Sequence, residues 1–116
     1  MAKSLQNSLS RALIGVTVLA VTGCFPAAGG IPEPVSPSDL TRAQADYPAV
    51  TDVELAQGRQ LFIDRCGSCH NHSELQAHSK AEWTPIMERM GRKADMSRAE
   101  TALALQFIVS RLRPRQ

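Results

Sequence analysis

Hydrophobic residues recur at helical spacing through the second half of the chain. Residues 51–54 (Thr-Asp-Val-Glu) fit a capping box, in which the first and fourth side chains bond to each other's backbone N–H groups and open a helix. The residues that follow at intervals of three or four positions share one helical face: Leu55, Gly58, Phe62 and Cys66. This pattern predicts a first helix that runs toward Cys66.

A second helix is predicted between Ser79 and Gly91. Residues 79–82 (Ser-Lys-Ala-Glu) form a possible capping box, whereas Thr84 and Pro85 offer a later start with proline at the first helical position. Gly91 is well placed to end this helix. Both starts are compatible with the pattern.

A third helix is predicted to open with the capping box at residues 97–100 and to run to about Leu112, just before Pro114. Its apolar positions are Leu105, Val109 and Leu112, with Ala102 and Ile108 beside them. Because strand-like alternation is almost absent, the fold class predicted for residues 51–113 is all-α. Residues 114–116 would form a short tail.

Residues 1–23 have the composition of a signal peptide. Lys3 and Arg11 are their only charged residues, and an apolar run of about eleven residues follows at 12–22. Such a run is too short to span a bilayer as a helix but is typical of the apolar core of a signal peptide. We therefore expect the protein to be exported.

The signal segment ends in Val-Thr-Gly-Cys at residues 21–24, which resembles the bacterial lipoprotein box. In that motif the cysteine receives the lipid and becomes the new N-terminus. Cys24 would then anchor the protein to a membrane on its periplasmic side. Phe25, rather than Asp, follows it, which by analogy with enteric bacteria favours the outer membrane. The alternative is an ordinary signal peptide with a free thiol nearby.

Residues 24–50 are rich in proline and predict a tether. Five of the seven prolines fall here, with glycine, serine and alanine between them. A segment of this composition cannot bury enough apolar surface to offset its ordering entropy. As a tether it would reach between about 30 Å as a coil and about 75 Å as extended polyproline. Alternatively, part of it around residues 40–47 packs on the domain, with Tyr47 as the expected contact.

Formal charge gives no support for nucleic-acid binding. The whole chain carries 13 basic and 11 acidic residues, and without Lys3 and Arg11 the basic count falls to 11. The mature chain would therefore be formally neutral, whereas a nucleic-acid-binding domain is usually basic.

The segment 66–70 (Cys-Gly-Ser-Cys-His) carries the strongest chemical information in the chain. Two thiols three positions apart, followed directly by an imidazole, match the motif for covalent attachment of a c-type haem. Cys66 and Cys69 would add across the two vinyl groups of the porphyrin, and His70 would bind the iron from one side. We predict one covalently bound haem c.

Two other interpretations of the motif are open. A thioredoxin-like dithiol would require a βαβ context, which the helical pattern does not provide. A zinc site would require a fourth ligand beyond Cys66, Cys69 and His70. His72 and His78 are candidates for that role, but their spacing fits no common zinc pattern.

Together, the helix before the motif and the motif itself make the chain similar to class I monohaem cytochromes c over about residues 53–112. The resemblance implies a small helical domain wrapped around the haem. It also implies that a glycine of the first helix lets the last helix cross closely against an aromatic residue, and Gly58 and Phe107 match those positions. A domain this small usually needs a staple, and the haem would supply it.

The iron ligand on the second face is less determined than His70. In this family it is usually a methionine in a loop well after the motif, but here the interval before the third helix is short. The spacing of Trp83, Arg89 and Met90 resembles the compact haem domains related to quinohaemoprotein dehydrogenases. We therefore predict Met90 as the distal ligand. The alternatives are Met87, Met96 and His78, and any of these methionines could instead be core packing. Trp83 and Phe62 are expected to pack against the haem.

The predicted function is electron transfer rather than catalysis, because no base, nucleophile or substrate pocket can be identified. Ligation by His and Met raises the potential of haem iron relative to two His ligands. Redox proteins would be the partners, and Arg89, Arg92 and Lys93 could form a basic docking rim or simply a solvated helix face. The alternatives are a haem-based ligand-binding or sensor module, with an open sixth position, and an electron-accepting subunit of a dehydrogenase complex.

Overall fold

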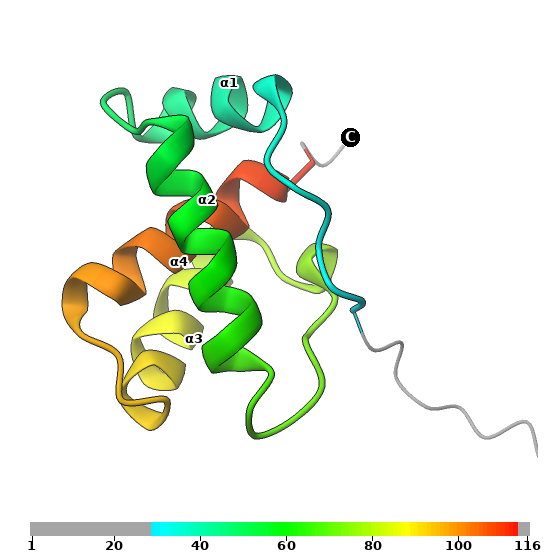
Figure 1. Cartoon of the computed structure of the whole chain (residues 1–116), viewed down its shortest axis with the longest axis vertical. Helices are drawn as coiled ribbons and strands as arrows, with labels where there is room; N and C mark the ends of the chain where they lie inside the picture. Colours follow the sequence, from blue (N-terminus) through cyan, green and yellow to red (C-terminus); the bar gives the residue numbers. More distant parts are fainter. Residues whose placement is uncertain (1–28, 114–116) are drawn as a thin grey trace, which may run out of the picture.

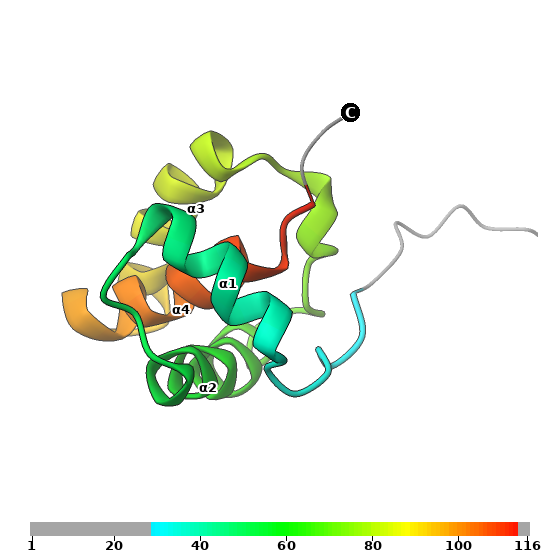
Figure 2. The same cartoon turned by 90° about the horizontal axis from the view of Figure 1, so that it is seen from above.

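The computed structural model describes residues 29–113. Within this range the chain forms four α-helices, two short helical turns and no strand, so the all-α prediction is confirmed (Figure 1). The elements in chain order are α1 (Pro37–Asp46), α2 (Asp52–Leu61), the π-helical turn η1 (Phe62–Cys66), the 3-10 turn η2 (Leu75–Ala77), α3 (Lys80–Lys93) and α4 (Arg98–Arg111). Helix α4 packs against each of the other three α-helices (Figure 2).

All four α-helices begin with a capping box. Those of α2, α3 and α4 are the three predicted from the sequence, with Thr51, Ser79 and Ser97 as the N-cap residues. Hydrogen bonds from the backbone and side chain of the N-cap residue lower the pKa of the partner carboxyl at Glu54 and at Glu100. The start of each α-helix is therefore determined by residues close together in the sequence.

Helices α2 and α4 cross in close contact at Gly58. A Cβ atom at this position would lie 2.1 Å from the Leu103 carbonyl oxygen and 3.0 Å from the Phe107 Cβ. Only glycine permits this approach without a shift of α4. The close crossing at Gly58 and Phe107, which the resemblance implied, is therefore confirmed.

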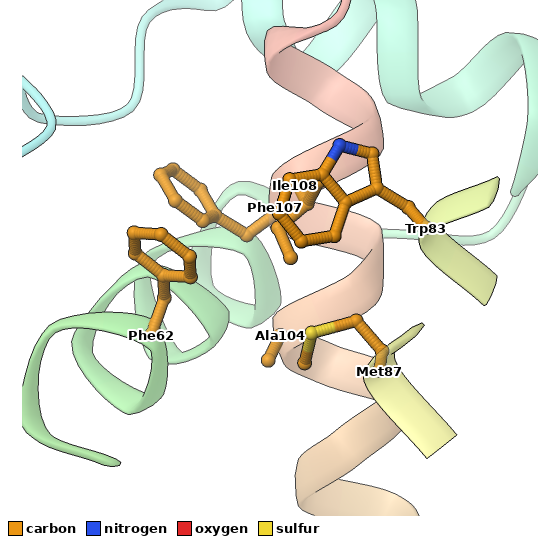
Figure 3. Packing of buried hydrophobic residues seen from close by; sticks show 6 residues of the cluster. All are labelled: Phe62, Trp83, Met87, Ala104, Phe107 and Ile108. Carbon is orange, nitrogen blue, oxygen red and sulfur yellow. The ribbon is translucent and has the colours of Figure 1, made fainter. Parts of the chain in front are cut away.

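The main core lies between η1, α3 and α4. Six buried side chains form it: Phe62, Trp83, Met87, Ala104, Phe107 and Ile108. Figure 3 shows Phe62 beside Phe107, while Trp83 and Met87 extend from α3 toward α4. The rings of Phe62 and Phe107 lie 5.9 Å apart at a tilt of 50°, an arrangement that aromatic pairs favour.

Helix α3 differs from the prediction at its end. It starts at the capping box of Ser79 and contains Pro85 in its interior, so the earlier of the two starts is used. Gly91 does not end it, because the helix continues to Lys93. Instead Gly91 is buried against α4, where a Cβ atom would lie 2.4 Å from the Thr101 Oγ1. Gly91 therefore permits close contact between α3 and α4 and does not end α3.

The tether predicted over residues 24–50 is corrected by helix α1. This helix packs on α4, and Ala43, Val50 and Leu55 form a second buried cluster with Leu40 and Tyr47 against it. The alternative interpretation, that residues 40–47 pack on the domain, describes the structure. The folded domain therefore begins well before residue 51, and residues 29–36 run along it in extended form (Figure 1).

A buried carboxylate fastens α1 to the end of α4. Asp39 is 2 % exposed and accepts hydrogen bonds from Ser36 and Arg42, and Arg111 lies 3.5 Å from it. Burial alone would raise the pKa of Asp39, but these hydrogen bonds and the two guanidinium groups lower it overall. Arg42 also donates to the Ser110 carbonyl at 2.7 Å, which ties the two helices directly.

The predicted signal peptide, Cys24 and the tail at 114–116 lie outside the described residues. Between residues 29 and 113, no helix combines the length and the hydropathy that a membrane crossing requires.

Candidate cofactor site

The Cys-Gly-Ser-Cys-His segment begins where helix α2 ends. The π-helical turn η1 continues α2 for five residues and finishes at Cys66. Such π-turns are rare and often occur at functional sites. Next in the chain, the Ser68 hydroxyl donates to the Arg65 carbonyl at 2.8 Å, closing a turn around the motif. The local backbone therefore delivers the motif to one end of the domain.

A cavity of about 520 Å³ separates this motif from helix α3. Its volume falls within the range of about 300–1,000 Å³ that small-molecule and cofactor sites occupy. Most of the residues predicted for the site line it together: Phe62, Cys66, Cys69, His70, His78, Trp83, Met87 and Met90. Met96 instead lines a different cavity, between α3 and α4. Residues far apart in the sequence thus converge on one hollow.

His70 lies exposed at the cavity with one ring nitrogen already engaged. Its Nδ1 lies 2.7 Å from the Asn71 carbonyl oxygen, which can only accept a hydrogen bond. In the neutral ring this contact requires the proton on Nδ1, which leaves the lone pair on Nε2. A metal-binding histidine usually donates its other N–H in this way, which fixes the tautomer and the ring orientation.

His72 has a structural role that removes it from the candidate ligands. Its Nε2 lies 3.1 Å from the Ile63 carbonyl oxygen, and its ring is 5.1 Å from that of Phe62. Gly67 lies directly against the same ring, since a Cβ atom there would be 2.6 Å from the His72 Cε1. His72 therefore holds the segment that carries the motif, residues 66–70, against the core.

The opposite wall of the cavity comes from helix α3 and the segment before it. Trp83 is buried, and its Nε1 donates to the Leu75 carbonyl at 2.9 Å, which fixes the indole plane. The His78 ring packs against this indole in a T-shaped arrangement, with ring centres 5.2 Å apart. Met90 is half-buried on the same wall, whereas Met87 is only 2 % exposed and belongs to the core.

The two thiols are free and differ in exposure. Cys66 is half-buried and Cys69 is exposed. Burial raises the pKa of the Cys66 thiol, which disfavours the thiolate that a redox dithiol or a zinc site requires. Across residues 29–113, no three His, Cys, Asp or Glu side chains come together as a metal-binding group.

Basic side chains surround one side of the cavity. Arg89 and Lys93 line it as the sequence suggested, but Arg92 lies at the separate cavity between α3 and α4. Arg65 takes its place, directly before Cys66 in the π-turn. The position of Arg65 depends on how η1 turns, so the spacing of charges along α3 could not reveal it.

The residues present fit a c-type haem. The cavity offers two thiols, an imidazole with a free Nε2, a methionine and walls of aromatic and aliphatic carbon that include Ile86 and Ala94. Thioether, imidazole and methionine sulfur are the attachments that haem c uses. No family model, curated protein or solved structure matches this chain.

Proposed function

We propose that the protein is a monohaem c-type cytochrome that carries single electrons between redox proteins. One observation carries the proposal: a single largely apolar cavity brings together both thiols of the motif, His70, Trp83 and Met90. When bound, haem c supplies a one-electron iron couple. No side chain in the cavity is required as a base or nucleophile for that role.

Each wall residue has a distinct part in this proposal. Cys66 and Cys69 hold the cofactor covalently, and His70 offers Nε2 to the iron while Asn71 keeps its ring in place. Phe62 and Trp83, both buried, supply rigid aromatic surface to the wall of the cavity. Rigid apolar walls limit rearrangement when the charge of the site changes, which suits an electron carrier.

Met90 is the distal ligand that the geometry favours. Met87 packs among Trp83, Ala104 and the other core residues, so withdrawing its sulfur would leave a void beside α4. Met90 is half-buried, lines this cavity and is not part of the core cluster. His78 is held in a T-shaped contact with Trp83. Met96 lines the other cavity.

Absorption spectra of the purified protein, oxidised and reduced, with and without carbon monoxide, test the function. We expect a low-spin spectrum, a ferric methionine-to-iron charge-transfer band, and no change with carbon monoxide. A high-spin spectrum with ready carbon monoxide binding would contradict electron transfer and support a ligand-binding sensor. In Met90→Ala the charge-transfer band should disappear, whereas in Met96→Ala it should persist.

We also propose that the domain is exported and lipid-anchored at Cys24. The proposal rests on the signal-peptide composition and on the Gly-Cys pair at residues 23–24. Membrane partition and intact mass of the wild type and of Cys24→Ser test it. The wild type should carry a lipid and remain with membranes, and the variant should lose both properties. A soluble wild type of unmodified mass would contradict the anchor.

A further inference from the structure

Residues 29–35 form a strap that two arginines hold against the domain. Arg59 of α2 donates from Nε and Nη2 to the Pro32 carbonyl oxygen at 2.9 and 2.7 Å, and from Nε to that of Glu33 at 3.0 Å. Arg111 of α4 donates to the Glu33 carbonyl and, at 2.8 Å, to that of Pro34. Charge-assisted hydrogen bonds of this kind are about twice as strong as neutral ones.

The first described residue of the strap lies on the loop that follows the haem motif. The Gly29 backbone N–H donates to the His72 carbonyl at 2.9 Å. A Cβ atom on Gly29 would lie 2.5 Å from the Ser73 carbonyl oxygen, so the two backbones are in direct contact. The chain therefore reaches the domain beside the cofactor site. In Figures 1 and 2 this point lies on the opposite side of the domain from the α3–α4 connection.

The strap leaves very little chain between the domain and the proposed anchor. Cys24 is five residues from Gly29, and five residues span at most ~18 Å when fully extended. We propose that the protein docks directly on the lipid surface. The strap and the loop at residues 71–74, which follows the motif, would face the head groups. The inference rests on the proposed lipidation of Cys24.

An exposed apolar side chain lies on this face. Ile31 is 68 % exposed and, with Val53 at 60 %, is one of two large hydrophobic residues left strongly exposed in the described chain. Formal charges around the strap nearly balance: the acidic residues are Glu33, Asp39 and Glu74, and the basic residues are Arg42, Arg59, Arg111 and Arg113. Attraction to anionic lipid is therefore weak, and the short attachment with Ile31 determines the orientation.

Paramagnetic relaxation on lipid nanodiscs tests the orientation. The lipidated holoprotein is bound to nanodiscs whose head groups chelate Gd³⁺, and amide signals are compared with La³⁺ discs, so that the protein's own iron cancels. We expect the largest signal loss at Gly30, Ile31 and Ser73 and the smallest at Asp95. The profile should persist at high salt. Equal loss over all faces, or the largest loss at Asp95, would overturn the inference.

Two variants test whether the short attachment is the cause. A twelve-residue Gly-Ser insertion between residues 28 and 29 keeps the strap and lengthens the attachment, so the losses at Gly30 and Ile31 should fall several-fold. Arg59→Gln should weaken the same losses, and Arg92→Gln should leave them unchanged. A profile that the insertion does not alter would overturn the inference. Wild type that fails to bind the discs would instead contradict the lipid anchor itself and the inference with it.

Discussion

The domain has two sides, the α1 side and the cavity side, that are filled in different ways. On one side α1 is fastened by a buried carboxylate, two arginines and the small cluster around Ala43, Val50 and Leu55. On the other, α3 and the motif loop surround a cavity of about 520 Å³ whose lining is largely apolar. The α1 side is completed by the chain's own side chains. The cavity side has apolar walls that the proposed haem would cover.

Removal of both motif thiols should give the largest effect, because it acts on the side that depends on an occupant. If the cavity holds the proposed haem, the double variant Cys66→Ala with Cys69→Ala cannot attach it, and the cavity walls lose their partner. We expect loss of the cooperative thermal transition, followed by circular dichroism. A cooperative transition close to that of the wild type would show that the cavity side, like the α1 side, is stable alone.

On the α1 side, Asp39→Ala should be the most damaging single change. It leaves Arg42 and Arg111 without their carboxylate partner and should cost about 3 kcal/mol in the free energy of unfolding. The absorption spectrum of the proposed haem should be unchanged in the folded protein, since Asp39 does not line the cavity. Urea unfolding measures the first effect. A spectral change would contradict the separation of the two sides.

The same carboxylate predicts a pH dependence. The folded state lowers the pKa of Asp39, so its stabilisation is fully present above the unfolded-chain value of about 3.9 and is lost as the pH falls through the folded pKa. Wild type should therefore lose stability in this acid range more steeply than Asp39→Asn. Parallel curves of unfolding free energy against pH for the two proteins would contradict the assignment.

Gly58→Ala should produce an intermediate effect that reaches both sides through α4. The new Cβ would meet the Leu103 carbonyl oxygen at 2.1 Å, so α2 and α4 must separate, at a cost of about 2 kcal/mol. Gly30→Ala is the matched control, because a Cβ atom there meets nothing within 4 Å. Equal melting temperatures for the two variants would show that the close crossing is not required.

The smallest effect is expected for Trp83→Phe. This change removes the hydrogen bond to the Leu75 carbonyl and should cost about 1 kcal/mol in unfolding free energy. It should also shift the absorption of the proposed haem slightly, because the indole forms one wall of the cavity. Comparison with Tyr47→Phe, which changes an aromatic residue on the α1 side, separates the two regions. If the spectrum shifted in Tyr47→Phe but not in Trp83→Phe, the assignment of Trp83 to the cavity wall would be contradicted.

Features that depend on neighbouring residues could be predicted from the sequence. The capping boxes at Thr51, Ser79 and Ser97 involve residues three apart, and all three begin helices. The grouping of Cys66, Cys69 and His70 follows from their spacing. The approach of Trp83 and Met90 to the motif came from a resemblance rather than from local pattern, yet they line the same cavity.

Features that depend on tertiary contacts could not be predicted from local sequence. The proline content of residues 24–50 concealed helix α1, although residues 36–39 (Ser-Pro-Ser-Asp) form a capping box with proline at the first helical position. Gly91 has the residue type of a helix stop, but its contact with Thr101 of α4 determines its role. Arg59 and Arg111 could not be recognised as strap-holding residues, because their partners are backbone carbonyls distant in sequence.

The intact mass of the denatured, purified protein tests the central claim most directly. If the cavity holds a covalent haem, the wild type should carry the added mass of one haem through denaturation, and the double variant Cys66→Ala with Cys69→Ala should not. Met96→Ala, outside the cavity, should retain the full mass. Wild type expressed with a haem-attachment system but lacking this added mass would contradict the account.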